Sequence, residues 1–275
     1  MEAVTIADYS IKDLISRRRS VRTYDGTPLR AEDRQKLEAY AQSLQNPFGI
    51  PVTFRILDAK AQNLSSPVVL GADTYLGAKV AHISNAEIAF GYDFERFVLY
   101  AQSLGIGTVW LAATIDRPAF ERAMEVMDGE VMPAVTPLGY PAAKKSVRES
   151  LMRKAIKADN RFSFETLFFQ NTFQEPLSPE NAGRFRDALE MVRLAPSVGN
   201  KQPWRIVICD GVIHFYEKKT MSPNALGDIQ KVDIGIALAH FMLTMEESSA
   251  DAVFFADDPG VIRDMDTEYI ISCRV

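Results

Sequence analysis

Cysteine and histidine are both scarce in this chain. Only two cysteines occur among 275 residues, Cys209 and Cys273, each within an apolar stretch that is typical of a strand. A disulfide framework is therefore not expected, and a reducing compartment is favoured. The three histidines show no metal-ligand spacing, so the sequence predicts no metal site.

Long apolar runs and long runs of one charge are also missing. No window reaches the roughly 18 to 20 apolar residues that a transmembrane helix needs, and residues 1–10 hold no apolar core of signal-peptide length. The net charge is −5, from 31 basic and 36 acidic residues, and no long basic run lies outside residues 17–22. We therefore expect a cytoplasmic protein with neither a membrane nor a nucleic acid as partner.

The motifs of several enzyme classes are absent as well. No Gly-x-Gly-x-x-Gly pattern follows a strand-like stretch, which argues against a classical dinucleotide fold. No serine or cysteine nucleophile motif stands out either. We accordingly single out no catalytic side chain.

Helix-like and strand-like stretches are mixed along the chain, which indicates the α+β class. Helices are expected for a short segment ending at residue 17 and for residues 31–44, 92–103, 118–127, 179–194 and 228–247, with a polar, helix-favouring stretch at 144–161. Strands are expected at residues 52–57, 108–111, 132–141 and 269–272, and as a pair around residues 210–211.

An internal repeat divides the sequence into two related lobes. Residues 37–58 align without gaps on residues 189–210, an offset of 152, and both read as the end of a helix, a loop and a strand. Residues 27–32 match residues 175–180 at an offset of 148. A stretch with two prolines follows residue 172, so we predict lobes at residues 1–172 and 173–275.

A basic loop near the start is found in the first copy alone. Arg18, Ser20 and Arg22 surround a hydroxyl with guanidinium groups, and arginine offers permanently charged, bidentate donors that suit a phosphate. At the offset of 148 the second copy holds Thr166, Phe168 and Gln170. The second copy therefore lacks the phosphate cradle.

A neutral loop downstream shows the opposite pattern. Residues 195–204 read Ala-Pro-Ser-Val-Gly-Asn-Lys-Gln-Pro-Trp, and the small groups and amide of Pro196, Ser197 and Asn200 suit a sugar-like chain and a flat ring. At the offset of 152 the first copy holds Leu44, Gln45 and Phe48. Each copy thus keeps one half of a site, and we expect one complete site per chain.

Four motifs together resemble the nitroreductase family of FMN-dependent oxidoreductases. They are Arg-Arg-Ser-x-Arg at residues 18–22, Leu-Gly-Ile-Gly-Thr at 104–108, Leu-Gly-Tyr-Pro at 138–141, and the block at 195–204. The block follows the basic loop by about 175 residues and lies in the second copy. The chain therefore resembles the branch in which one polypeptide imitates the family homodimer, and this implies a monomer.

The resemblance implies a set of cofactor-binding residues. Arg18, Ser20 and Arg22 would hold the phosphate and ribityl chain of FMN, and Pro196, Ser197 and Asn200 would approach the flavin from the other lobe. Leu111 and Ala112 fall where the family presents a backbone N–H to the flavin N5, and Arg161 falls near a second basic phosphate contact. Near the flavin N1 and O2 the candidates are Lys60, Lys79 and Arg205.

The implied reaction moves a hydride from NAD(P)H to the flavin and then electrons to a nitroaromatic, a quinone or a similar small acceptor, in a ping-pong cycle. The flavin itself carries this chemistry. Two alternatives stay open at this point: a relic of the fold that has lost turnover or the flavin, and a different flavin reaction on the same scaffold.

Overall fold

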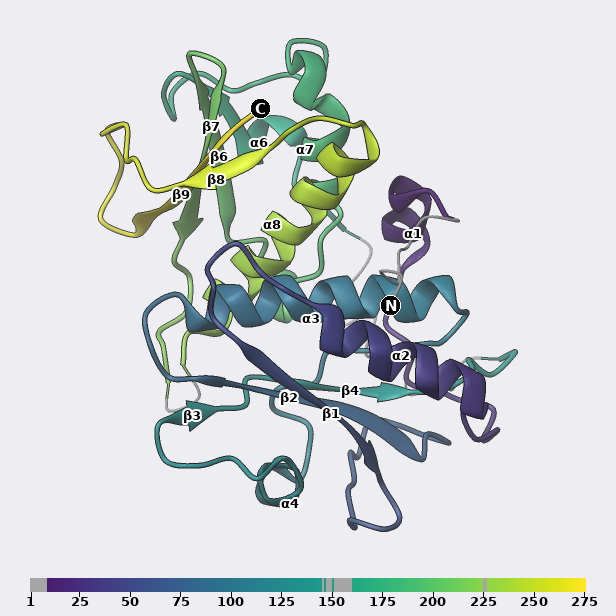
Figure 1. The fold of residues 1–275 in the computed structure, drawn as a ribbon. Helices are drawn as coiled ribbons and strands as arrows, with labels where there is room; N and C mark the ends of the chain where they lie inside the picture. Colours follow the sequence, from purple (N-terminus) through teal and green to yellow (C-terminus); the bar gives the residue numbers. More distant parts are fainter. Residues whose placement is uncertain (1–8, 145, 147–149, 151–159, 225–226) are drawn as a thin grey trace.

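The computed structural model describes residues 9–144, 146, 150, 160–224 and 227–275 (Figure 1). Most of the helix-favouring stretch expected at 144–161 lies outside the described residues. The elements form two sheets with helices packed between and beside them, which is the α+β architecture that the sequence predicts.

The first half of the chain builds a sheet of four strands. Its strands are β1 (Val52–Asp58), β2 (Thr74–Ala81), β3 (Glu130–Val131) and β4 (Val135–Leu138). Its helices are α1 (Ile11–Arg17), α2 (Ala31–Ser43), α3 (Ala86–Ser103) and α4 (Arg117–Met124). All pairs are antiparallel, β2 pairs with each of the other three strands, and β1 therefore lies at an edge.

The second half builds a sheet in the order β5-β6-β7-β9-β8. Its strands are β5 (Phe168–Gln170), β6 (Trp204–Cys209), β7 (Val212–Lys218), β8 (Val253–Phe255) and β9 (Thr267–Arg274). Its helices are α6 (Phe164–Leu167), η1 (Gly183–Phe185), α7 (Arg186–Arg193), η2 (Val198–Asn200) and α8 (Ile229–Glu247). β5 pairs with β6 in parallel, although it precedes the predicted lobe boundary, so the chain crosses to the second sheet before residue 172.

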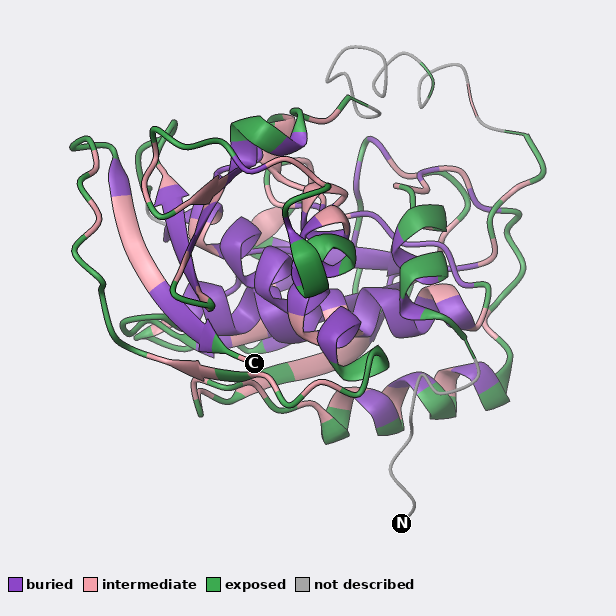
Figure 2. Ribbon diagram, turned by 90° about the horizontal axis from the view of Figure 1, so that it is seen from above, coloured by how far each residue is buried: buried purple, intermediate pink, exposed green. Residues whose placement is uncertain are grey.

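Two long helices, α3 and α8, cross at the centre of the molecule (Figure 1). Figure 2 shows this central region as almost wholly buried. A Cβ at Gly91 in α3 would lie 2.1 Å from the carbonyl oxygen of Val232, and one at Gly235 in α8 would lie 2.1 Å from that of Ile88. The backbones therefore touch, and a glycine from each half makes that approach possible.

Most expected elements are present, with three corrections. The expected strand at 108–111 is wrong, because Thr108 bridges Ser20 while Leu111 bridges Val135, and no continuous ladder joins them. The helix expected from residue 179 begins with η1 at Gly183. The strand at 52–57 exists but is half-buried over most of its length, since it lies at a sheet edge.

The correspondence at the offset of 148 does not extend to the basic loop. Phe168 and Gln170 lie in β5 and pair with β6, whereas Ser20 bridges Thr108 and Thr23 bridges Leu70. The apolar residues around Phe168 favour a place in a sheet, which moves this segment away from the position that the repeat predicted. The phosphate cradle still belongs to the first half.

Candidate functional site

Three of the four sequence motifs meet beside the loop that follows α1. Ser20 bridges Thr108 in parallel, and the N–H of Val21 donates to the Thr108 carbonyl over 2.9 Å. The N–H of Gly107 donates to the Gly139 carbonyl over 2.8 Å. The basic loop, the Leu-Gly-Ile-Gly-Thr motif and the Leu-Gly-Tyr-Pro motif are thus neighbours in space.

The glycines of these motifs are required by close packing. A Cβ at Gly107 would lie 2.9 Å from the side chain of Val21, and one at Gly139 would lie 2.8 Å from the ring of Tyr24. Since Cβ contacts this short essentially never occur, larger residues would displace the basic loop. The motif glycines therefore position Ser20 and its basic neighbours.

Arg18 turns inward and joins a buried polar network. Its Nε lies 3.6 Å from Oε1 of Glu95 in α3, and the two side chains are 7% and 0% exposed. The same oxygen lies 3.0 Å from Nε2 of His240 in α8, and Oε2 accepts a hydrogen bond from Trp110. His240 Nδ1 lies 2.8 Å from the carbonyl oxygen of Met191 in α7. This network ties the basic loop to both central helices and to the second half.

The other residues of the basic loop have different surroundings. Arg22 is buried and Ser20 is half-buried. Arg19 is exposed and lines a cavity of about 240 Å³ together with Gly107 and Pro141. The sequence interpretation passed over Arg19, although it stands inside the Arg-Arg-Ser-x-Arg motif and would be the solvent-facing cation of the loop.

The neutral loop of the second half has a fixed conformation. Ser197 Oγ accepts from the N–H of Gln202 over 2.9 Å, and the N–H of Val198 donates to both carboxylate oxygens of Asp233 over 3.1 Å. Asn200 and Gln202 have positive φ, at 58° and 49°, in the left-handed region that few residues adopt. Pro196 is half-buried at the start of this loop.

Arg161 contacts the neutral loop directly. Its Nη1 donates to Asn200 Oδ1 over 3.3 Å, and its Nη2 donates to the Leu194 carbonyl over 3.2 Å. Asn200 Nδ2 in turn donates to the Asn160 carbonyl over 3.0 Å. The structure therefore places Arg161 beside Asn200 and the loop that holds Ser197.

Leu111 and Ala112 lie at the entry to a loop beside β4. The N–H of Leu111 donates to the Val135 carbonyl over 2.9 Å, so the sheet already uses that donor. Ala112 is half-buried, and its carbonyl accepts from Arg117 Nη2 over 2.5 Å. Of the two residues, Ala112 is the better candidate for a donor to a ligand.

The three candidates for a cation near the flavin N1 and O2 have different surroundings. Lys60, in the turn after β1, pairs with Asp73, and Lys79, in β2, pairs with Glu130, each over 2.6 Å. Arg205 Nη1 donates to the Gln202 carbonyl over 3.0 Å, and burial lowers the pKa of its guanidinium. Only Arg205 of these three lies against the neutral loop.

Asp233 and Glu95 were not singled out from the sequence. Each is a carboxylate on a long, largely buried helix, at the contact between the halves, and each is almost fully buried. Burial raises the pKa of Asp233 well above its usual value, while its bond from Val198 acts in the opposite direction. An acidic residue whose neighbours at helical spacing are mostly apolar is the signal that would have found both.

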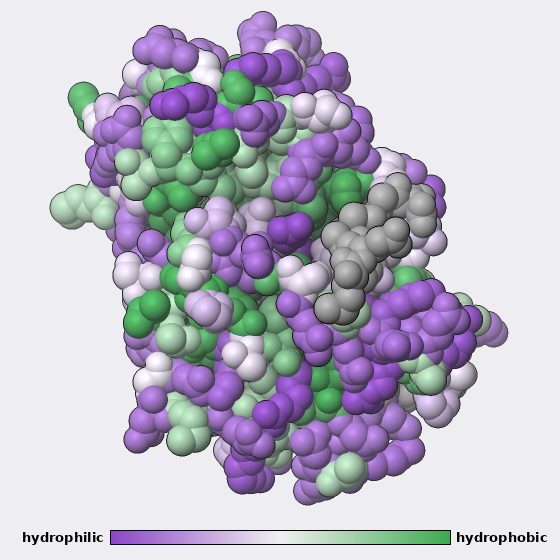
Figure 3. Space-filling view, in the orientation of Figure 1, coloured by the Kyte–Doolittle hydropathy of each residue, from purple (hydrophilic) through white to green (hydrophobic). Residues whose placement is uncertain are grey.

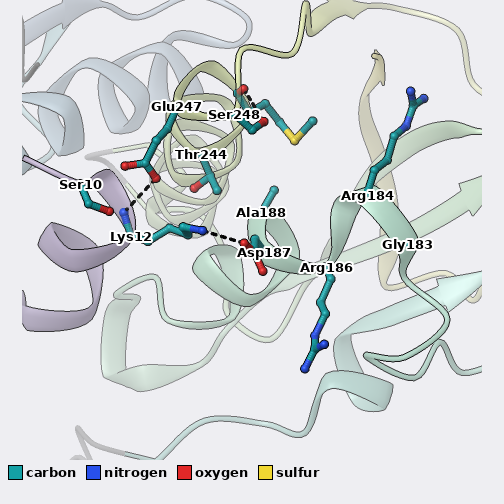
Figure 4. Close-up of a pocket in the computed structure, with 11 residues that line it drawn as sticks. Ser10, Lys12, Gly183, Arg184, Arg186, Asp187, Ala188, Thr244, Glu247 and Ser248 are labelled. Carbon is teal, nitrogen blue, oxygen red and sulfur yellow. Dashed lines mark hydrogen bonds and ion pairs between the residues drawn. The ribbon is translucent and has the colours of Figure 1, made fainter.

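A cavity of about 410 Å³ lies at the other end of α8, between α1 and the start of α7. Figure 4 shows Lys12 reaching across it to Asp187, an ion pair of 2.7 Å. Glu247 accepts from the N–H of Ile11 over 2.6 Å. These contacts hold α1 against the second half, so the basic loop starts from a helix anchored on both lobes.

Figure 3 shows one face of the molecule, where hydrophobic residues gather in patches among hydrophilic ones over both halves.

Two classes of site are absent from the described residues. They contain no group of three or more histidine, cysteine or acidic side chains suited to a metal ion. None of the helices in the described ranges is both long and apolar enough to cross a membrane.

Comparison with known proteins identifies the family. A family model described as "Putative TM nitroreductase" matches residues 10–245, while no curated protein matches the sequence. A putative nitroreductase from Thermotoga maritima MSB8 matches in structure with a TM-score of 0.62 and 22% identity, over 96% of this chain and 93% of that chain. A putative NADH dehydrogenase/NAD(P)H nitroreductase from Bacteroides thetaiotaomicron VPI-5482 gives a TM-score of 0.43 and 20% identity, over 50% of this chain and 90% of that one.

An FMN-dependent nitroreductase from Clostridium difficile R20291 gives a TM-score of 0.39 and 16% identity, over 51% of this chain and 94% of that one. The Thermotoga protein shares the fold along almost its whole length, so the predicted nitroreductase-like fold with two lobes in one chain is confirmed. Since the family model spans most of the sequence, the chain belongs to the nitroreductase family that this model describes.

Proposed function

We propose that this protein is an FMN-dependent oxidoreductase with one flavin site per chain, built from both lobes. It would act as a cytoplasmic monomer, with lobes at residues 1–172 and 173–275, taking a hydride from NAD(P)H and passing electrons to a nitroaromatic, a quinone or a similar small acceptor. The observation that supports this most is the arrangement of the motifs. Three of them surround Ser20, and a buried network runs from Arg18 to α7, just before the neutral loop.

The donor set suits the phosphate of FMN. Ser20 offers a hydroxyl, Arg19 and Arg22 flank it in sequence, and Arg161 presents a guanidinium beside the neutral loop. Guanidinium groups form strong charge-assisted bonds with phosphate oxygens. Arg18 would position the basic loop without contacting the phosphate, because its side chain is buried against Glu95.

The neutral loop suits the polar edge of a flavin. Asn200 offers an amide from a backbone that is already fixed, and Ala112 offers a backbone N–H from the first half. When bound, the flavin supplies hydride acceptance and delivery, so the protein needs to bind and orient it and requires no acid or base. Arg205 would supply positive charge beside the ring.

A titration of the purified protein with FMN tests this proposal. We expect one equivalent of FMN per chain, with Arg22→Ala weakening binding by about 1.5 to 3 kcal/mol through loss of a charge-assisted bond. Arg17→Ala is the matched control, because Arg17 is exposed and pairs with Asp13 on the helix surface. Riboflavin, which lacks the phosphate, should bind equally to the wild type and to Arg22→Ala. Saturation at two equivalents would contradict the composite site.

A second candidate function is a relic of the fold that no longer binds flavin. Two observations favour it: the Arg18 guanidinium faces Glu95 inside the protein, and the N–H of Leu111 is committed to Val135. The same titration distinguishes the two. Colourless protein that ignores added FMN, while unfolding cooperatively, would support the relic.

A further inference from the structure

The internal repeat relates two grooves, each formed by a helix and an edge of a strand. At the offset of 152, α2 corresponds to η1 with α7, and β1 corresponds to β6. In the second half, β5 pairs in parallel along β6. Among the described residues, β2 is the one strand that pairs with β1, so the outer edge of β1 has no strand beside it.

The segment at 160–171 fills the groove of the second half. α6 packs against both α7 and β6, and three apolar side chains of α6 and β5 are deeply buried, with Phe164 at 5% and Leu167 and Phe168 at 0% exposure. The rings of Phe164 and Phe168 pack edge to face, 4.5 Å apart. The N–H of Asn171 donates to the Ile208 carbonyl over 2.8 Å. This segment belongs to the first predicted lobe, residues 1–172, but packs on the second sheet, and no described segment of the second lobe pairs with the first sheet.

The corresponding groove of the first half is open. It has a volume of about 320 Å³ and is lined along α2 and β1 by Ala41, Leu44, Phe54 and Ile56, among others. Phe54 and Ile56 are half-buried, whereas their counterparts Ile206 and Ile208 are buried beneath the crossing segment. The difference in exposure is what a missing strand would leave.

The hydrogen bonds at one backbone carbonyl also differ between the two grooves. Ile56 is the counterpart of Ile208, and its carbonyl accepts a long bond of 3.5 Å from Arg34 Nη2. The Ile208 carbonyl instead accepts from Asn171 N–H over 2.8 Å and from Gln170 Nε2 over 3.1 Å. Arg34, which also pairs with Glu38, thus covers an edge acceptor that a strand covers in the other half.

We propose that the groove between α2 and β1 binds a segment of a partner protein that forms one helical turn followed by a short strand, and that this strand adds parallel to β1. The side chains expected of this partner segment follow from residues 160–171. They are a basic residue near the start and then apolar residues at the spacing of Phe164, Leu167 and Phe168. Strand addition of this kind takes affinity from backbone hydrogen bonds and specificity from alternate side chains. The site is independent of flavin binding.

Charge supports a basic residue at the start of the partner segment. In the second half, Arg161 donates to the carbonyl of Leu194 at the end of α7. The counterpart of Leu194 is Gln42, in the last turn of α2, which has no basic residue of its own. Glu38 also lies on the rim. A cation here would meet the negative end of a helix, whereas Glu38 already pairs with Arg34 over 2.9 Å.

A second copy of this chain is the weaker occupant. The segment of a second copy that has the right chemistry, residues 160–171, is already buried against its own β6. Releasing it would expose Phe164, Leu167 and Phe168 and break the β5 ladder.

A labelled peptide with the sequence of residues 160–171 is the probe, and its binding to the full chain is measured by fluorescence anisotropy. We expect saturable binding that Ile56→Glu weakens by about tenfold or more, because the charge would enter an apolar groove. Val253→Glu is the matched control, since Val253 is exposed on the edge strand β8 of the other sheet, and it should change binding by less than about twofold.

A second peptide tests strand addition. Phe168 accepts from Leu177 and Gln170 donates to Glu175, so the backbone of Phe169 faces β6. A peptide with proline at the position of Phe169 lacks the N–H that would face β1 and should lose binding. Absence of saturable binding, or equal binding to Ile56→Glu, would overturn the proposal. Self-association of the chain without peptide, abolished by Ile56→Glu, would also overturn it in favour of a second copy.

Discussion

The crossing of α3 and α8 predicts an unusual response to alanine. In an exposed helix, replacing glycine by alanine stabilises a protein by roughly 0.5 to 1 kcal/mol, because glycine loses more backbone entropy on folding. At Gly91 the new Cβ would lie 2.1 Å from the Val232 carbonyl oxygen, although real Cβ contacts essentially never fall below 3.0 Å. The helices would have to separate by about 1 Å for Gly91→Ala to fit.

The size of the effect follows from these opposing terms. Overpacking of a well-packed interior costs about 1 to 3 kcal/mol, and the contact here is with backbone, which cannot rotate away. The helix-propensity gain offsets less than 1 kcal/mol of that cost. We therefore expect Gly91→Ala to lower the free energy of unfolding by about 1 to 2 kcal/mol, and Gly235→Ala to behave in the same way.

Urea denaturation followed by far-UV circular dichroism measures this change. The double variant is the internal control: because both methyl groups act on one crossing, a single separation of the helices accommodates both, and the combined loss should be smaller than the sum. An unchanged or increased stability of Gly91→Ala would refute the close backbone contact. Strict additivity would refute the view that the two glycines serve one crossing.

Three further predictions concern buried carboxylates and the neutral loop. Burial raises the pKa of Glu217 to about 7 from an ordinary 4.5, so the folded state keeps a proton that the unfolded chain releases. The free energy of unfolding should therefore fall as pH rises from about 4.5 to about 7. Glu217→Gln should reduce that fall by about 2 to 3 kcal/mol, measured by urea titrations at pH 5 and pH 8. An equal effect of the substitution at both pH values would contradict this prediction. Asp233→Ala should cost about 1 to 3 kcal/mol of stability by leaving the Val198 N–H without its acceptor, with faster hydrogen exchange at Val198 as the check. Asn200→Gly keeps a backbone with φ of 58° but loses the side-chain amide. It should therefore weaken FMN binding by about 1 to 3 kcal/mol with little change in melting temperature. Equal FMN affinity of the variant and the wild type would remove Asn200 from the site.

The sequence by itself determined the features that depend on local pattern. Apolar spacing and breakers located α2, α4 and α8 to within a few residues, and the pair of strands around residues 210–211 appears as β6 and β7. Both cysteines are free, as their scarcity predicted. The internal repeat indicated two lobes, and the four motifs indicated the family, because residue chemistry and spacing are visible without any long-range contact.

The tertiary structure alone decided which distant segments meet. Whether β1 is a buried strand or an edge depends on a partner elsewhere in the chain, and so does the pairing of β5 with β6. The inward turn of Arg18 depends on Glu95, which lies 77 positions away on another helix. Periodicity reports how one segment is patterned, whereas edges, crossings and buried charge networks are set by the packing of segments whose separation in sequence carries no signal of their contact.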